Sequence, residues 1–197
     1  MASNTLNRTV WHGLVAGAVL ALAAPAVASA DALEPEASLP FDRSHSVDEV
    51  PFGETMEPVV ENYGRPAPYV ASGGMITDEA MGYFAERGFR TVVSLLTPSE
   101  GTEAHREQAE AAGINYYNFG VTSDGPGTEQ VEGLREVLAD PDNYPVMIHC
   151  ASANRVGALW ARYRIEMGVP VEVAFQEARA VGLNAGLEET LRGRMGL

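Results

Sequence analysis

One stretch of this chain, residues 146–158, constrains the fold more than any other, because three local patterns follow one another in it. An apolar run typical of a buried strand ends at His149 and Cys150, and Cys150 is the single cysteine among 197 residues. Arg155 and a helical pattern from Val156 come next. A buried strand that turns into a helix is typical of a mostly parallel α/β sheet, whose ligands bind beyond the carboxyl ends of the strands. The four residues between the cysteine and the arginine are Ala151, Ser152, Ala153 and Asn154.

The turn between this strand and this helix is expected to bind an anion. Successive backbone N–H groups of residues 151–155 would point inward at the start of a helix, where the helix dipole adds positive potential. Cys150 at that place is predicted to be a thiolate nucleophile, and Arg155 can hold an oxyanion through two parallel hydrogen bonds. The competing interpretation is a buried, inert thiol, since cysteine is among the most buried residue types.

The His149-Cys150 pair, the loop of small residues and Arg155-Val156-Gly157 resemble the signature of the cysteine-dependent phosphatases, the tyrosine and dual-specificity superfamily. The superfamily usually has five residues between cysteine and arginine. The shorter loop resembles a bacterial branch, the phosphatase-like DUF442-type domain also found in beta-lactamase hydrolase-like proteins. The six residues from cysteine to arginine also resemble the loop of the rhodanese sulfurtransferases.

The phosphatase resemblance implies a role for each matching residue. Cys150 would attack phosphorus and form a phosphocysteine, while Arg155 and the loop amides hold the phosphoryl oxygens. Asp124 lies in a Gly/Pro-rich loop where the superfamily has its catalytic acid, although an aspartate is also common at the start of such a turn. His149 would support the loop without binding a metal. Val156 stands where a serine or threonine usually assists departure of the thiolate, which predicts slow turnover of the phosphocysteine.

Three functions therefore compete at this stage. The first is a phosphatase acting on a phosphorylated protein, such as a phosphotyrosine protein, or on a small phosphate ester. The second is a sulfurtransferase with a persulfide on Cys150, which needs amide donors but no general acid. The third is a weakly active anion-binding module. Glu129 and Glu103 are weaker alternatives to Asp124 as the acid. His45 and His105 have no ligand spacing with each other or with Cys150, so we predict no metal and no cofactor.

The first thirty residues predict export. Arg8 precedes an apolar segment, and a small-residue site ends at Ala30, as in a cleaved secretory signal. The protein would then be periplasmic or secreted, without a membrane span after cleavage; an uncleaved anchor is the alternative. The chain has 27 acidic and 13 basic residues, and loss of the signal would take its net charge from −14 to −15. Such a charge disfavours nucleic acid as a partner. No pattern indicates an oligomeric state.

Residues 31–67 are rich in proline and acidic residues and predict a linker or irregular lead-in to a domain over 68–197. From there, strand and helix patterns alternate. The alternation predicts a mostly parallel sheet flanked by helices, like that of the protein tyrosine phosphatases. The predicted strands are 69–72, 91–96, 114–119 and 145–149. The predicted helices are 79–87, 102–112, 129–138, 156–167, 171–181 and 187–195.

Overall fold

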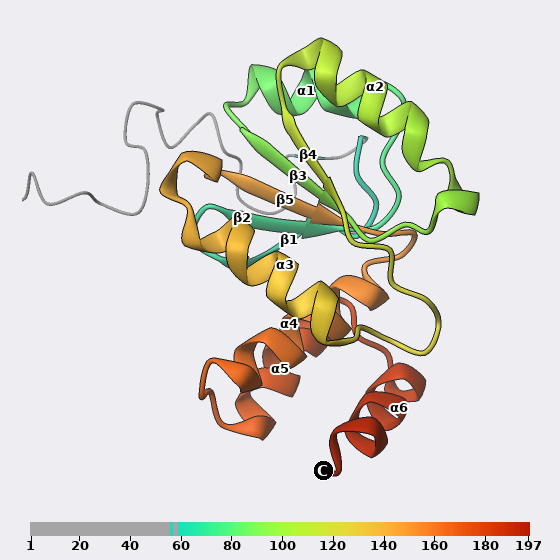
Figure 1. Ribbon diagram of the computed structural model, residues 1–197, viewed down its shortest axis with the longest axis vertical. Coiled ribbons are helices and arrows are strands. Elements are labelled where there is room, and N and C mark those ends of the chain that lie inside the picture. The colour runs from blue at the N-terminus through green and yellow to red at the C-terminus, as the bar shows by residue number, and fades with distance from the viewer. Residues whose placement is uncertain (1–55, 57–58) are drawn as a thin grey trace, which may run out of the picture. The chain divides into compact units, whose positions relative to one another are not determined.

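The computed structural model describes residues 56 and 59–197, and these form a five-stranded sheet with helices on both faces (Figure 1). The strand order is β1-β2-β5-β3-β4; β1 runs antiparallel to β2, and the other pairs are parallel. The predicted mostly parallel α/β sheet is therefore confirmed. The predicted signal, 1–30, lies outside the described residues. The strands are β1 (Gly64–Ala67), β2 (Val70–Gly73), β3 (Thr91–Ser94), β4 (Asn115–Asn118) and β5 (Val146–His149).

The helices form a layer on each face of this sheet. Figure 1 shows α1 and α2 above one face and α3 and α4 against the other, with α5 packed on α4. Two short 3₁₀ turns complete the fold: η3 (Pro98–Glu100) follows β3, and η4 (Pro141–Asn143) precedes β5. The helices are α1 (Ala80–Glu86), α2 (Thr102–Ala112), α3 (Thr128–Ala139), α4 (Asn154–Glu166), α5 (Val171–Val181) and α6 (Ala185–Met195).

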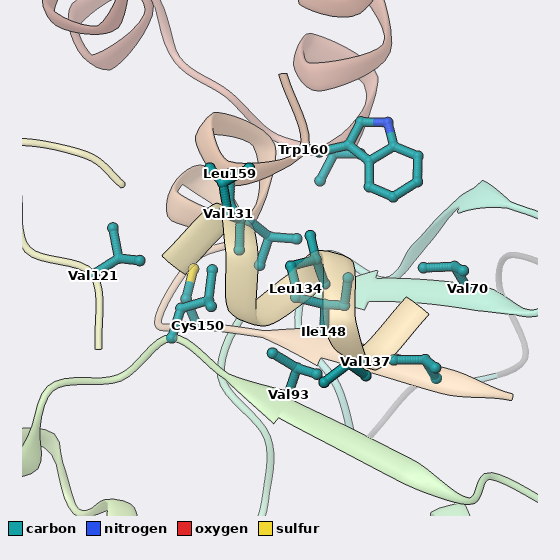
Figure 2. Packing of buried hydrophobic residues seen from close by; sticks show 14 of the residues in the cluster. Val70, Val93, Val121, Val131, Leu134, Val137, Ile148, Cys150, Leu159 and Trp160 are labelled. Carbon is teal, nitrogen blue, oxygen red and sulfur yellow. The ribbon is translucent and has the colours of Figure 1, made fainter. Parts of the chain in front are cut away.

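Strand β5 lies in the middle of the sheet and is buried on both faces. Val146 and Ile148 belong to the apolar cluster that also contains residues of α3 and α4, whereas Met147 belongs to the cluster on the α1 and α2 side. Successive strand residues point to opposite faces, so a strand covered on both sides needs a continuous apolar run. Figure 2 shows that the first cluster continues to Cys150, directly after the strand.

The packed part of the chain begins before residue 68. Val59 and Val60 are buried in the cluster on the α1 side, and β1 pairs with β2 although it lies in the segment predicted as a lead-in. The sequence did not predict this short edge strand, because proline and charged residues are typical of a linker. An edge strand tolerates proline, since an N–H on its open side needs no partner. Within the described residues, no helix is long and apolar enough to cross a membrane.

Helix α4 begins two residues earlier than the pattern predicted, at Asn154. Ala153 precedes it with a left-handed backbone (φ 68°), which ends the loop and lets the helix start at once. Arg155 therefore lies in the first turn of α4, which fixes the direction in which its side chain leaves the helix.

Helices α4 and α5 approach most closely at Gly157. A Cβ atom there would lie 2.7 Å from both the Ala178 carbonyl oxygen and the Leu183 amide nitrogen. We expect Gly157→Ala to lower the free energy of unfolding by about 2 kcal/mol, because backbone atoms cannot yield as a flexible side chain does. The control is Gly193→Ala in α6, where nothing lies within 4 Å and helix propensity should add up to about 1 kcal/mol. Urea unfolding of both variants checks this, and equal midpoints would contradict it.

Candidate active site

Cys150 lies at the carboxyl end of the central strand and is completely buried. Its backbone N–H donates to the Gly73 carbonyl (3.2 Å), which continues the pairing of β5 with β2. Figure 2 shows the sulfur pointing to the α4 side of the sheet, in the cluster that includes Val121 and Leu159. The burial that the inert-thiol interpretation expected is thus present, and what separates a nucleophile from an inert thiol is the set of groups around the sulfur.

The loop after Cys150 presents backbone donors without acceptors. In the described part of the chain, no backbone carbonyl accepts from the N–H groups of Ala151, Ser152, Asn154, Arg155 or Val156. The loop is nevertheless held in place, because the Met75 N–H donates to the Ala151 carbonyl (3.1 Å). Unpaired N–H groups at a helix start form an anion site. These unpaired N–H groups are compatible with an anion-binding turn, which stays a prediction.

The residue that takes the left-handed backbone in this loop is Ala153. Gly182 makes the position possible, since a Cβ on Gly182 would lie 2.9 Å from that of Ala153. Asn154 instead anchors the loop, because its Oδ1 accepts from the Asn184 N–H (2.9 Å) and so ties the loop to the start of α6. Ala153 is buried, so it shapes the loop from beneath.

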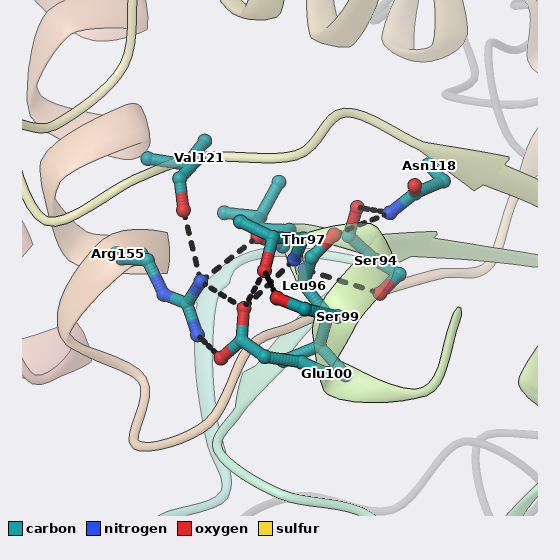
Figure 3. A network of polar contacts seen from close by, with 9 residues as sticks. Ser94, Leu96, Thr97, Ser99, Glu100, Asn118, Val121 and Arg155 are labelled. Atoms are coloured by element: carbon teal, nitrogen blue, oxygen red, sulfur yellow. Dashed lines mark hydrogen bonds and ion pairs between the residues drawn. The ribbon is translucent and has the colours of Figure 1, made fainter.

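Arg155 is held by a two-pronged ion pair with Glu100 (Figure 3). Its Nη2 donates to Glu100 Oε1 (2.7 Å) and its Nη1 to Glu100 Oε2 (2.9 Å). Nη1 also donates to the carbonyls of Val121 (2.9 Å) and Leu95 (3.3 Å). Among the described residues, no oxygen accepts from Nε or from the second hydrogen of Nη2, and the Cys150 side chain lies beside the guanidinium. These two donors lie on one edge of a planar guanidinium, so Arg155 keeps a fork for an oxyanion while its other edge is fixed.

The charges around this fork stabilise one another. The hydrogen bond from Arg155, opposed by partial burial, lowers the pKa of Glu100 from 4.5 to about 2. The hydrogen bond to Glu100 raises the pKa of Arg155, and the Cys150 side chain beside the guanidinium raises it further. The guanidinium beside Cys150 is therefore held in its charged form by Glu100.

Sequence analysis missed Glu100. The signal was present, because Thr97 and Glu100 have the spacing of a capping box: the Thr97 N–H donates to Glu100 Oε2 (2.8 Å). That pattern marks the start of the η3 turn, but it gives no hint of an arginine that lies 55 residues away in the chain.

An open pocket beside the loop brings four of the eight predicted site residues together, and Cys150 is not among its lining residues. Ala151, Ser152, Asn154 and Arg155 line it, together with residues that the sequence did not single out. Hydroxyl groups predominate among these additions, and they suit the oxygens of a phosphate ester. The added residues are Thr97, Ser99, Glu100, Thr122, Ser123 and Leu187.

Asp124 does not line this pocket; it is exposed and lines the neighbouring one, one residue beyond Ser123. Two arginines hold its loop. Arg194 of α6 donates to the carbonyls of Asp124 and Gly125, and Arg162 of α4 donates to the Pro126 carbonyl (2.8 Å). The loop therefore has a fixed path next to the site, and the role of Asp124 as acid stays a prediction. The alternative acids Glu129 and Glu103 are exposed and line no part of the pocket.

His149 lies on the opposite side of the sheet from Cys150, against His105 of α2. Their ring centroids are 5.4 Å apart, and the backbone of Cys150 and Gly74 lies beside the His149 ring. Burial, followed by repulsion from His105, lowers the pKa of His149 to about 3. His149 is thus neutral near neutral pH and fills space beneath the loop. The described residues contain no group of three or more His, Cys, Asp or Glu that could hold a metal ion.

A parallel sheet with a cysteine loop after its central strand and an arginine in the next helix defines the class of cysteine-dependent, tyrosine-phosphatase-like enzymes. A family model described as a DSP-PTPase phosphatase fused to NAD+ kinase matches residues 54–191. The chain belongs to this family of phosphatases, which makes it a phosphoric monoester hydrolase by class and confirms the resemblance found in the sequence. No curated protein sequence gives a significant match.

Solved structures support the same fold. The DUF442 protein of Shewanella putrefaciens has 17% identity and a TM-score of 0.56, over 68% of this chain and 89% of that one. The catalytic domain of the yeast PP-IP phosphatase SIW14 has 20% identity and a TM-score of 0.55, over 68% and 85%. TpbA of Pseudomonas aeruginosa, solved with phosphotyrosine, has 21% identity and a TM-score of 0.53, over 71% and 92%.

The Glu100–Arg155 pair predicts a pH-dependent contribution to stability. Because folding lowers the pKa of Glu100 from 4.5 to about 2, its contribution should be complete above about pH 4.5 and decline as the pH falls toward 2. Glu100→Gln should therefore be less stable than the wild type near neutral pH and approach it in acid. Urea unfolding between pH 7 and 3 measures the difference. The control is Glu103→Gln, which changes an exposed acid on α2. A difference in the free energy of unfolding between the wild type and Glu100→Gln that does not change with pH would contradict this prediction.

Proposed function

We propose that this chain is a cysteine-dependent phosphatase that hydrolyses phosphate monoesters through a phosphocysteine on Cys150. The observation that supports it best is the free edge of Arg155 beside the unpaired loop N–H groups, next to the single cysteine. Together these donors match the oxygens of one phosphoryl group. The proposal includes export, which rests on the sequence of residues 1–30 alone.

In the first step the Cys150 thiolate attacks phosphorus, and the bond from phosphorus to the ester oxygen breaks. The equatorial oxygens would be held by the loop N–H groups and by Nε and Nη2 of Arg155, where charge spreads in the transition state. Glu100 and the carbonyls of Val121 and Leu95 fix the guanidinium beforehand, so little reorganisation is needed. Because Cys150 is buried, the loop has to uncover the sulfur when the phosphoryl group enters.

Asp124 is the proposed proton donor to the leaving oxygen. It would then act as the base for the second step, taking a proton from the water that attacks the phosphocysteine. That attack releases inorganic phosphate and restores the thiolate. The hydrogen bonds from Arg194 and Arg162 to the backbone of this loop support a fixed approach of Asp124 toward the pocket.

The substrate is proposed to be a phosphate ester, either on a protein or on a small molecule. Phosphotyrosine is one candidate, because TpbA was solved with it, and SIW14 acts on PP-IP compounds. The residues that line the pocket place hydroxyl groups around Arg155 and include no aromatic side chain. A sulfurtransferase reaction remains the alternative that the short loop favours, and a test with Cys150 and Asp124 variants separates the two.

The first test is hydrolysis of phenyl phosphate and p-nitrophenyl phosphate under reducing conditions. We expect Cys150→Ser to abolish turnover. Asp124→Ala should lower kcat/KM, which reports the step in which the ester oxygen leaves, by about 100-fold or more for phenyl phosphate and less for p-nitrophenyl phosphate, whose leaving group hardly needs a proton. Vanadate affinity should change little in Asp124→Ala. The matched control is Glu129→Ala, an exposed acid five residues further along.

Each outcome decides between the interpretations. An equal loss of kcat/KM for both esters would remove Asp124 as the acid while leaving the phosphatase intact. Absence of any Cys150-dependent turnover would contradict the phosphatase, and a sulfur mass gained on Cys150 from thiosulfate would then support sulfur transfer. Ligand affinity that persists in Cys150→Ser without turnover in either assay would indicate an anion-binding module.

Val156 predicts which step limits the rate. It is buried in the apolar cluster and has no hydroxyl to assist departure of the thiolate. We expect a rapid release of nitrophenol close to one equivalent, followed by a slow steady state that reports hydrolysis of the phosphocysteine. Val156→Thr, which keeps the volume, should raise the steady-state rate about tenfold and leave the first phase unchanged. Stopped-flow absorbance measures both phases, and a wild type without a burst would contradict this assignment.

A further inference from the structure

A second pocket adjoins the catalytic pocket and shares Thr122 with it. It lies between the loop after β4 and helix α6, which Figure 1 shows next to each other. Polar side chains of Gln130, Thr190 and Arg194 line it, along with Asp124 and glycine backbone. The pocket is therefore a polar extension of the site and begins where the catalytic pocket ends.

Arg194 is unusual among the arginines of this acidic chain. Most of the described arginines pair with a glutamate, as Arg164 does with Glu177 (2.8 Å) and Arg179 with Glu188 (2.7 Å). No carboxylate of the described residues lies within ion-pair distance of Arg194, although acids outnumber bases 27 to 13. Its positive charge is thus left uncompensated beside the catalytic pocket.

The hydrogen bonds of Arg194 fix its orientation without using all its donors. Nη1 donates to the carbonyls of Asp124 and Gly125, while Nε and Nη2 have no acceptor among the described residues. A guanidinium anchored in this way offers Nε and Nη2 as a preformed fork for an anion, at little cost in side-chain entropy. The side-chain NH₂ of Gln130 adds donors to the same pocket, because its Oε1 accepts from the Gly127 N–H, whereas the Thr190 hydroxyl already donates to the Gly186 carbonyl (3.0 Å).

The one acid that lines this second pocket is Asp124. The arrangement then has one cation for the reacting phosphate, Arg155, and another for a second group, Arg194.

We propose that the second pocket is an anion subsite in which Arg194 binds a second phosphate or carboxylate of the substrate. The inference rests on the proposed phosphatase function and narrows it to small phosphate esters that carry two anionic groups. The second group would remain on the product, because only the group above Cys150 reacts. Nothing in this assignment requires new chemistry; it adds binding energy and orientation at the same site.

The test is calorimetric binding to the full chain, with methylphosphonate as the single anion and bisphosphonates joined by one to four methylenes as the double anions. We expect one linker length to bind at least about tenfold more tightly than methylphosphonate, as for a charge-assisted hydrogen-bonded pair. Arg194→Gln should remove that gain. Arg87→Gln, which loses the same charge directly after α1, where Arg87 stacks over Tyr83, should keep it.

The outcomes separate the subsite from the proposed function. Methylphosphonate that binds, with no gain at any linker length, would overturn the subsite and leave the phosphatase standing. A gain that persists in Arg194→Gln while kcat for p-nitrophenyl phosphate falls would show that Arg194 only holds the Asp124 loop, which also overturns it. Failure of every phosphonate to bind would overturn both proposals. Selective loss of the bisphosphonate gain, with the affinity for methylphosphonate kept, would support the subsite.

Discussion

The ion pair between Glu100 and Arg155 is the interaction on which the site depends. It joins the turn after β3 to the first turn of α4, and the same guanidinium reaches the carbonyls of Leu95 and Val121. Three chain segments that meet at the carboxyl edge of the sheet are thereby fixed around one cation. Because these partners occupy one edge of the guanidinium, its other edge is left for an oxyanion, which is how an internal ion pair prepares an external binding site.

A buried loop backbone is stabilised by what packs behind it. Ala153 takes a left-handed conformation that costs an alanine on the order of 1 kcal/mol, and the absence of a side chain on Gly182 leaves room for its methyl group. Asn154 adds a hydrogen bond to the Asn184 backbone. The helices that follow the signature thus hold the loop in shape, so α5 and α6 contribute to the site although they contain none of the reacting groups.

The arginines of the last helices give an acidic chain its local positive potential. Most of them, Arg155 included, pair with glutamates, but Arg155 and Arg194 each keep donors free beside adjoining pockets. A net charge of −14 describes the chain as a whole and says little about a pocket a few ångströms wide, since screening by salt limits the reach of distant charges. This is why the acidic composition, which disfavours polyanionic partners, is compatible with a phosphate site.

Local sequence determined the alternating elements, the parallel sheet, and the position of Cys150 and the anion-binding turn at its edge, because strand and helix periodicity and the strand–loop–helix signature act over short spans. It could not find β1, whose composition resembles a linker, nor Glu100 as the partner of Arg155, since contacts between distant segments leave no local pattern. Tertiary structure alone decided that Ala153 is the left-handed residue, that Asp124 borders a neighbouring pocket, and that Arg194 meets its loop. Those features depend on how helices pack across the sheet, which no short segment encodes.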